Sequence, residues 1–356
     1  MKDKKILVIS LSGIGNTILF TPFLNSLREN YPETEIDFLA LNQGIADVVL
    51  GGNLINSIFV FSKKPFRILK TLWQLRKKHY DYSVIVFPSN KWQFNVLAFL
   101  IGAKNRITHK YKCCQLKTLS FLQNKKILAV EGIHDVEQNM NLLRIFGINP
   151  KKEESKLTFY ISEEDKKFAE DFLKENHLEN DFLVGTHPGA GGTNKNWQGF
   201  SKRWPEENFI ELYNKLIEEK NAKILIFGGP EEMELKNRIR HLSNHKENII
   251  IINESLKHIA AIIKKCNVFI SNDSGLMHIA EASKVPIIGI FGPSNHIRTA
   301  PTTLNSQIIR LNLSCSPCLE YPFHSTSSKI KCNKDFECLR KIKVEDVIDK
   351  INEILK

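Results

Sequence analysis

Short apolar segments alternate with segments of helical periodicity along the whole chain, and no other feature constrains the fold as strongly. In the first half, the pattern predicts strands over residues 5–9, 35–41, 57–61 and 83–87. In the second half, it predicts strands over residues 182–186, 223–227, 249–252, 268–271 and 287–291. Alternation of this kind produces parallel sheets with helices on both faces. We therefore predict an α/β protein built from two Rossmann-like blocks.

The chain length agrees with two blocks, because 356 residues correspond to about two domains. A stretch of Gly, Asn, Pro and charged residues at 147–155 is the best boundary between them. We predict an N-terminal domain over 1–155 and a C-terminal domain over 156–340 with a Cys-rich loop at 312–339. The apolar spacing over 341–356 predicts an amphipathic final helix.

Charge is divided unevenly between the two halves. Residues 1–160 hold 23 Lys and Arg against 12 Asp and Glu, whereas residues 161–356 hold 27 of each, so the whole surplus of +11 lies in the first half. A surplus of one sign favours an anionic partner there, and a solvated basic surface is the alternative. No apolar run approaches the roughly 18–20 residues that span a bilayer. The start of the chain resembles a strand more than a signal peptide, so we expect a cytoplasmic protein.

A glycine-containing turn follows the first predicted strand. Gly13 and Gly15 would let a ligand approach the backbone at the start of a helix, whose N-terminus favours anions. The third glycine of a dinucleotide fingerprint would fall at Ile18, and no acidic residue ends the second strand. Both absences argue against NAD. A tight turn without a ligand is the alternative.

Two further loops follow strands of the second half. His187, Gly189 and Thr193 belong to a glycine-rich loop, and Lys202 follows it with Arg203. Backbone N–H groups and cations of this kind suit a diphosphate, although a lone histidine is more often a packed loop residue. A second loop carries Gly228-Gly229-Pro230 before two acidic residues, Glu231 and Glu232. Either carboxylate could accept hydrogen bonds from ribose hydroxyls, or cap a helix.

The strongest motif is Asn272-Asp273-Ser274-Gly275-Leu276-Met277-His278. A strand ends there, Asp273 or Ser274 is placed to cap the next helix, and Gly275 lets that helix begin close to a ligand. The helix N-terminus offers unpaired N–H groups and about half a positive charge to a phosphate. Simple capping is the alternative.

Taken in order, these pieces resemble glycosyltransferase family 9, the ADP-heptose:lipopolysaccharide heptosyltransferase family. The resemblance extends over residues 6 to about 340 and rests on Gly13-Ile14-Gly15, His187-Pro188-Gly189-Ala190, Lys202-Arg203-Trp204-Pro205, Gly228-Gly229-Pro230-Glu231, the Asp273–His278 motif and Phe291-Gly292-Pro293. It implies a GT-B architecture, in which two Rossmann-like domains with parallel sheets face each other across a cleft and the last helix packs back toward the N-terminal domain. It also implies an inverting enzyme that needs no cofactor or metal for catalysis.

The resemblance further implies where each substrate binds. The N-terminal domain would bind an anionic lipopolysaccharide-core-type acceptor at the cytoplasmic membrane surface, and the C-terminal domain would bind ADP-heptose. Lys202 would neutralise the donor phosphate, Ser274 and Gly275 would offer backbone N–H groups, Glu231 would lie near the ribose, and His278 would support the loop or the sugar. The implied donor-binding set is Gly13, Gly15, His187, Gly189, Thr193, Lys202, Glu231, Asp273, Ser274, Gly275 and His278.

Other substrates and activities remain open at this stage. The acceptor could be a protein hydroxyl, or the donor another nucleotide-sugar. A nucleotide-sugar epimerase and a non-catalytic binding protein are the rivals, and we expect no nucleic-acid partner. Segments 66–82 and 109–127 mix Lys and Arg with apolar residues such as Trp73 and Phe121, which suits peripheral contact with the membrane. Exposed basic helices that bind nothing are equally common.

One residue departs from the family pattern. Family members often carry Asp after this Gly-x-Gly, as the base that takes the acceptor proton, but here the residue is Asn16. A carboxamide cannot act as a general base. Asn16 could orient the hydroxyl while a donor phosphate oxygen or another residue takes the proton. Otherwise the protein uses an acceptor other than that of the family, or it is slow or inactive.

Four of the seven cysteines lie within 24 residues near the end of the chain: Cys315, Cys318, Cys332 and Cys338. A cytosolic chain should not carry structural disulfides. The spacing suits a tetrahedral thiolate site for zinc or iron, which would fasten the loop without taking part in catalysis. Four free thiols, or a disulfide formed during preparation, are the alternatives.

Overall fold

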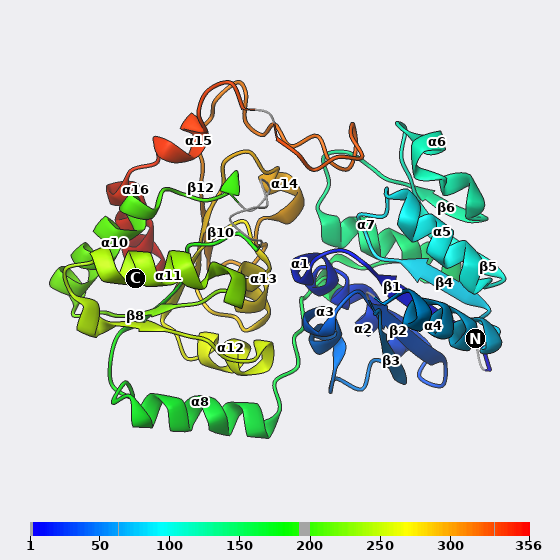
Figure 1. Ribbon diagram of the computed structural model, residues 1–356, viewed down its shortest axis with the longest axis horizontal. Helices are drawn as coiled ribbons and strands as arrows, with labels where there is room; N and C mark the ends of the chain where they lie inside the picture. Colours follow the sequence, from blue (N-terminus) through cyan, green and yellow to red (C-terminus); the bar gives the residue numbers. More distant parts are fainter. Residues whose placement is uncertain (1–2, 63, 192–199, 331) are drawn as a thin grey trace. The chain divides into compact units, whose positions relative to one another are not determined.

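The computed structural model describes residues 3–62, 64–191, 200–330 and 332–356, without the side chains of Pro65 and Lys152. It divides into two compact units (Figure 1). The N-terminal unit comprises Met1–Tyr160 together with Glu320–Ser328, and the C-terminal unit comprises Ile161–Leu319 together with Lys329–Lys356. Each unit is described separately below.

The N-terminal unit is built on one parallel six-stranded sheet. Its strands are β1 (Lys5–Ser10), β2 (Glu35–Ala40), β3 (Ser57–Val60), β4 (Tyr82–Ile85), β5 (Asn105–Lys110) and β6 (Lys125–Leu128). Their order in the sheet is β3-β2-β1-β4-β5-β6. This is the doubly wound order of a Rossmann fold, and it arises because successive right-handed crossovers run first toward one edge and then toward the other.

Helices cover both faces of this sheet. They are α1 (Ile14–Ile18), α2 (Thr21–Asn30), α3 (Gln43–Val49), α4 (Pro65–Lys77), α5 (Trp92–Ile101), α6 (Gln115–Thr118) and α7 (Asp135–Asn141). Leu75 of α4 and Leu97 of α5 are buried in one core cluster with Leu7 and Ile9 of β1. Helices α4 and α5 therefore pack on the same face of the sheet.

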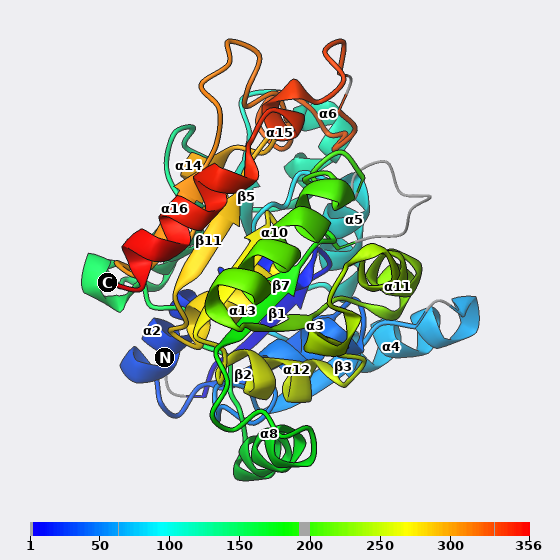
Figure 2. The ribbon, with the colours of Figure 1, turned by 90° about the vertical axis from the view of Figure 1, so that its left-hand side faces the viewer.

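The C-terminal unit repeats the design. Its strands are β7 (Leu183–His187), β8 (Lys223–Ile226), β9 (Ile249–Ile251), β10 (Val268–Asn272), β11 (Ile287–Ile290) and β12 (Ser306–Ile309). They form a parallel sheet of order β12-β11-β10-β7-β8-β9. Its helices are α8 (Glu163–Glu175), α10 (Glu206–Lys220), α11 (Met233–Leu242), α12 (Leu256–Ile263), α13 (Gly275–Ala282), α14 (His296–Thr299), α15 (Glu337–Arg340) and α16 (Val344–Ile354). Figure 2 shows α10, α13 and α16 running alongside the strands of this unit.

The order of the strands determines where each unit can bind a ligand. In the C-terminal unit, β7 and β10 are neighbours at the centre of the sheet, and Ser271 is paired with His187 at their carboxyl ends. The helices after these two strands lie on opposite faces, so their loops diverge and leave room above the strand ends. In the N-terminal unit the corresponding pair is β1 and β4.

The last helix, α16, belongs to the C-terminal unit. The apolar side chains Val344, Val347 and Ile351 of α16 belong to the core of the C-terminal unit, against Leu212 of α10. Part of the Cys-rich loop instead belongs to the N-terminal unit, where Asn90 Nδ2 donates to the carbonyl oxygen of Pro322 at 2.6 Å. Within the described ranges, no helix combines the length and the apolarity that crossing a bilayer requires.

Candidate functional site

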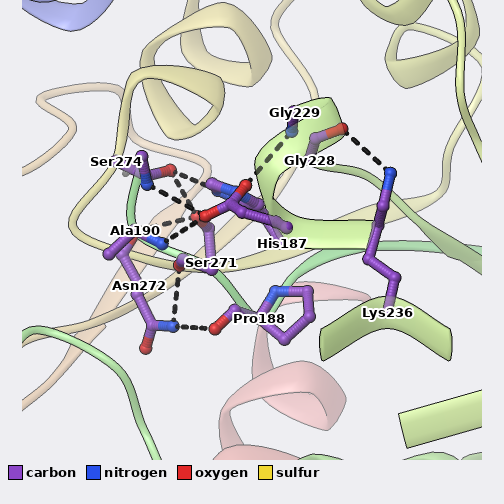
Figure 3. A network of polar contacts seen from close by, with 12 residues as sticks. His187, Pro188, Ala190, Gly228, Gly229, Lys236, Ser271, Asn272 and Ser274 are labelled. Carbon is purple, nitrogen blue, oxygen red and sulfur yellow. Dashed lines mark hydrogen bonds and ion pairs between the residues drawn. The ribbon is translucent and has the colours of Figure 1, made fainter. Parts of the chain in front are cut away.

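The side chain of Asn272 joins three of the motifs singled out in the sequence. It lies at the end of β10, fully buried, and its Nδ2 donates to the carbonyl oxygens of Pro188 at 2.9 Å and Gly189 at 3.0 Å. Its Oδ1 accepts from the backbone N–H of Trp204 at 3.0 Å. The loop after β7, the Lys202–Pro205 segment and the end of β10 are thereby held together. Figure 3 shows the contact between Asn272 and Pro188.

Glu232 is the buried anion at the centre of this site. Its side chain accepts hydrogen bonds from His187 Nε2 at 2.9 Å and from three backbone N–H groups, those of Ala190, Gly191 and Gly229. Burial alone would raise the pKa of Glu232, but the interactions with His187, Arg203 and the Gly229 N–H lower it to about 2. The carboxylate is therefore ionised at neutral pH and anchors both glycine loops.

His187 connects Glu232 to Ser274. Because the ionised carboxylate only accepts, His187 Nε2 carries the proton of that hydrogen bond. On the other side of the ring, Nδ1 lies 2.8 Å from Ser274 Oγ. Ser274 Oγ also lies 2.9 Å from Ser271 Oγ. A carboxylate, an imidazole and a hydroxyl thus form a buried chain that links the turn after β8 to the ends of β7 and β10. Figure 3 shows His187 and Ser274 in this network from close by.

The position of the Ser274 hydroxyl has a consequence for α13. Ser274 is the N-cap residue of α13, but its side chain makes no capping hydrogen bond, because the hydroxyl is directed to His187 and Ser271. The expected cap is therefore absent at Ser274. A helix N-terminus without a side-chain cap keeps its first N–H groups available for an anion such as a phosphate. Gly275 begins this helix without a side chain in the way.

Lys202 lies directly beside the start of α13. Its Nζ is 2.6 Å from Asp273 Oδ2, and Asp273 Oδ1 accepts from Thr299 Oγ1 at 3.2 Å. Burial would raise the pKa of Asp273, but Lys202, Ser294 and His278 together lower it. Since Asp273 is ionised, it fixes the ammonium group of Lys202, whose side chain is 19% exposed, at the head of the helix.

His278 lies one turn further along α13 and is buried. Its Nδ1 is 3.6 Å from Glu281 Oε2. Glu281 Oε1 in turn accepts from the backbone N–H of Thr302 at 2.7 Å and from its hydroxyl at 3.2 Å. His278 therefore packs on a carboxylate that links α13 to the segment after α14.

Gly189 and Gly228 are required by the close approach of Glu232. A Cβ added at Gly189 would lie 1.9 Å from Glu232 Oε1, and one added at Gly228, where φ is +148°, would lie 2.7 Å from Oε2. Lys236 of α11 holds the loop of Gly228 in place. Its fully buried Nζ donates to the carbonyl oxygens of Gly228 and Ile252, both at 3.0 Å. Burial lowers the pKa of Lys236 despite the nearby glutamates.

The N-terminal unit carries its own glycine turn at the end of β1. Gly13 is the N-cap residue of α1, and a Cβ at that position would meet nothing within 4 Å. Gly15 and Asn16 belong to the first turn of α1, and Asn16 is half-buried. Ser10 Oγ lies 2.8 Å from Thr17 Oγ1 and ties the helix to the strand.

The structure brings seven of the eleven expected donor-binding residues together, and Gly13 and Gly15 belong instead to α1 of the N-terminal unit. His187, Gly189, Lys202, Asp273, Ser274, Gly275 and His278 lie around the ends of β7 and β10. Thr193 lies outside the described residues. Glu231 is exposed, whereas its neighbour Glu232 is 2% exposed and carries the hydrogen bonds.

The sequence analysis includes Glu232 and Asn272 in their motifs without the anchoring roles that they have in the structure, and it does not single out Lys236. Each is polar and buried, and each holds loops rather than facing open space. Asn272 is the last residue of β10, Glu232 ends the 3-10 turn after the β8 loop, and Lys236 lies in α11, so the available signal was their place near strand ends. That signal does not distinguish an inward side chain from an outward one, so it leaves Glu231 and Glu232 equivalent, and Glu231 is implied only by the family resemblance.

The predicted metal site is not supported. Burial raises the pKa of Cys338 to about 11, and Cys318, Cys332 and Cys315 contribute to this shift, so the four thiols occupy one region. Across the part of the chain that the structure describes, however, no three His, Cys, Asp or Glu side chains are grouped closely enough to hold a metal ion. Cys315 and Cys318 are exposed.

The fold and the site define a class of protein. Both units are doubly wound. At the switch point of the C-terminal unit lie an uncapped helix N-terminus, a lysine and glycine loops. This combination is typical of enzymes that bind nucleotides or their sugar derivatives. A sequence profile of glycosyltransferase family 9 (heptosyltransferase) matches residues 68–327, and the chain belongs to this family. It is thus a glycosyltransferase, and its α/β GT-B fold is the one expected from the sequence.

Individual relatives match this chain over nearly its full length. Lipooligosaccharide heptosyltransferase 2 of Campylobacter jejuni is 25% identical over 361 residues, covering 98% of this chain and 99% of the relative. The crystal structure of a family 9 glycosyl transferase from Veillonella parvula matches with a TM-score of 0.78 at 24% identity, covering 99% and 97%. The structure of E. coli ADP-heptose lps heptosyltransferase II matches with a TM-score of 0.73 at 22% identity, covering 99% and 98%.

Proposed function

We propose that this protein transfers heptose from ADP-heptose to an anionic acceptor of the lipopolysaccharide-core type, with inversion at the anomeric carbon and without a catalytic metal. The donor binds the C-terminal unit and the acceptor binds the N-terminal unit. One observation carries the proposal: Lys202, fixed by Asp273 at 2.6 Å, lies beside the uncapped N-terminus of α13. The names of the relatives from C. jejuni and E. coli support heptose as the sugar and ADP as its carrier.

The chemistry needs positive charge at this place. When the acceptor oxygen attacks the anomeric carbon, the bond from that carbon to the diphosphate breaks, and the leaving ADP gains negative charge. The N–H groups at the start of α13 and the ammonium group of Lys202 stabilise that charge more in the transition state than in the bound donor. The Glu232–His187–Ser274 chain keeps the helix start and the glycine loops in place while this happens.

The acceptor hydroxyl must also lose its proton. Asn16 accepts a hydrogen bond from this hydroxyl through its side-chain oxygen and orients it, and the proton passes to a phosphate oxygen of the donor or to another residue. This assignment rests on the position of Asn16 in the first turn of α1, beside the open space at Gly13. An amide is a sufficient acceptor for orientation but has no useful basicity.

The acceptor is a phosphorylated glycolipid in this proposal, so the enzyme works in the cytoplasm at the inner face of the cytoplasmic membrane. The net charge of +11 in residues 1–160 supports an anionic acceptor on the N-terminal unit. A protein hydroxyl as acceptor is an outcome that the experiment below distinguishes.

A structural zinc or iron on the Cys-rich loop would fasten the loop without taking part in transfer. Four thiols in one region favour it, and the lack of a group of three ligands among the described residues stands against it. Zinc and iron analysis of protein purified without chelator decides the question. Absence of both metals removes the site, and the transferase proposal is unaffected.

The donor is tested by thermal denaturation with a panel of nucleoside diphosphates and nucleotide-sugars. A ligand that binds only the folded state raises the midpoint according to its affinity. ADP and ADP-heptose should stabilise the protein, whereas UDP and GDP species should not. The same panel is then run for turnover with a lipopolysaccharide-core acceptor and with protein acceptors. Stabilisation by UDP or GDP species alone would refute the donor assignment, and binding without turnover would identify a non-catalytic homologue.

A further inference from the structure

One stretch of the N-terminal unit combines positive charge with exposed apolar side chains. Residues 48–130 hold 15 Lys and Arg but only one acidic residue, Asp81. Of the 19 large apolar side chains that are exposed in the described part of the chain, 12 lie in this stretch. Exposed apolar groups among cations without acids are unusual for a surface that faces only water.

Helix α4 concentrates both properties. Phe66, Leu69 and Trp73 are 79%, 66% and 58% exposed. Successive residues of an α-helix are rotated by about 100°, so positions i, i+3 and i+7 form one narrow stripe along the helix. Leu75, which is fully buried against the sheet, lies on the opposite side of the helix axis. The stripe Phe66–Leu69–Trp73 is thus directed away from the core of its own unit.

Cations border this stripe. By the same rotation, Lys70 and Lys77 lie along one side of it and Arg76 along the other, and all three are exposed. Lys77 Nζ lies 3.4 Å from the centroid of the Trp73 ring, so a cation and an aromatic ring are presented together. Figure 2 shows α4 projecting from the body of the N-terminal unit.

We infer that this face of α4 docks on an anionic phospholipid surface. The apolar stripe enters the boundary between headgroups and acyl chains, and Lys70, Arg76 and Lys77 contact lipid phosphates. The charge complementarity favours lipid over a second copy of the chain, because two such faces would repel each other. This inference rests on the proposed function, since a glycolipid acceptor lies in the membrane that the helix would contact.

The test is co-sedimentation of the full-length protein with vesicles. Wild-type protein should bind vesicles of phosphatidylethanolamine and phosphatidylglycerol, should bind phosphatidylcholine vesicles weakly, and should be released by salt. The triple variant F66S/L69S/W73S should bind the anionic vesicles at least about tenfold more weakly. Its matched control, L242S/L304S/L355S, removes three exposed apolar side chains of the C-terminal unit and should bind like wild type.

A second pair of variants tests the charges. K70Q/K77Q should weaken binding about fivefold for each lysine removed. Its control, K246Q/K264Q, removes two exposed lysines of the C-terminal unit and should not weaken it. Unchanged vesicle binding by F66S/L69S/W73S would overturn the inference. A molecular mass of F66S/L69S/W73S that differs from the wild-type mass in light scattering would also overturn the inference, because the stripe would then be a contact between copies of the chain.

The assay also separates this inference from the transferase proposal. Transfer to a water-soluble acceptor sugar without lipid chains should be equal in wild type and F66S/L69S/W73S, because the stripe does not touch the reacting groups. If the wild type transfers nothing but binds vesicles through the stripe, the proposed function fails and the docking face stands. If transfer occurs but the stripe variant still binds vesicles, the docking face fails and the proposed function stands.

Discussion

Lys202 Nζ lies 2.6 Å from Asp273 Oδ2, at the point where β10 ends and α13 begins. The two residues are separated by 71 positions in the sequence. The pairing places a fixed cation at the positive end of a helix dipole, and in the proposed mechanism both would act on the same anion. The proposed stabilisation of the leaving diphosphate depends on this relationship.

Replacement of Lys202 by Met should lower kcat/KM about 100-fold or more, because a charge that acts on the leaving group in the transition state is lost. Steady-state kinetics with ADP-heptose measures the effect. Lys350→Met removes a lysine paired with Glu353 at 2.7 Å on the surface of α16 and serves as the matched control. Equal kcat/KM in Lys202→Met and wild type would contradict the role of this cation.

Glu232 should contribute to stability in a pH-dependent manner. Its pKa is lowered to about 2 in the folded state, so the contribution is fully present above the unfolded pKa of about 4.5 and is lost as the pH falls toward 2. The shift corresponds to roughly 3 kcal/mol. Glu232→Gln should therefore be destabilised at neutral pH, and its free energy of unfolding should change less than that of wild type between pH 5 and pH 3.

Urea denaturation at several pH values measures this difference. Glu219→Gln, which changes an exposed carboxylate of α10, should keep the wild-type dependence on pH. A Glu232→Gln variant as stable as wild type at pH 7 would show that Glu232 does not anchor the glycine loops.

The fold was largely predictable because most central strands are continuous apolar runs, which is the pattern of strands buried on both faces. Strands β5, β6 and β12 were missed. β6 and β12 are short edge strands, and β5 carries Thr108 and His109, which are buried but polar. His109 Nε2 lies 3.0 Å from the carbonyl oxygen of Gln138, a partner 29 residues away that local periodicity cannot reveal.

The site was predictable at the level of loops but not of individual side chains. Glycines and cations after strand ends identified the regions around His187, Lys202 and Ser274. Which of two adjacent glutamates is directed inward depends on the short 3-10 turn Pro230–Glu232, where Glu232 folds back to the Gly229 N–H. Glu232 also accepts from His187, which lies 45 positions away in the sequence, and local periodicity does not reveal that contact.

Asn16→Asp should raise the rate of transfer, because a carboxylate at this place could take the proton of the acceptor hydroxyl. The pH profile of kcat/KM should then show a new acidic limb near the pKa of that carboxyl. Asn16→Ala, which removes both orientation and basicity, should be slower than wild type. If Asn16→Asp abolishes turnover while folding normally, Asn16 does not stand where a base would act.

Gly13 and Gly189 provide a matched pair for testing which glycines serve folding and which serve ligands. A Cβ at Gly189 would lie 1.9 Å from Glu232 Oε1, so Gly189→Ala should displace the carboxylate and lower the free energy of unfolding by about 1–3 kcal/mol. A Cβ at Gly13 meets nothing within 4 Å, and φ there is −83°, so Gly13→Ala should leave stability within about 0.5 kcal/mol of wild type. Kinetics of Gly13→Ala then separate the two substrates. If the acceptor approaches this backbone, KM for the acceptor should rise while the thermal shift with ADP-heptose stays as in wild type. If Gly13 binds the donor, as the family resemblance implies, that thermal shift should fall instead. A normal acceptor KM in Gly13→Ala would place the acceptor elsewhere on the N-terminal unit.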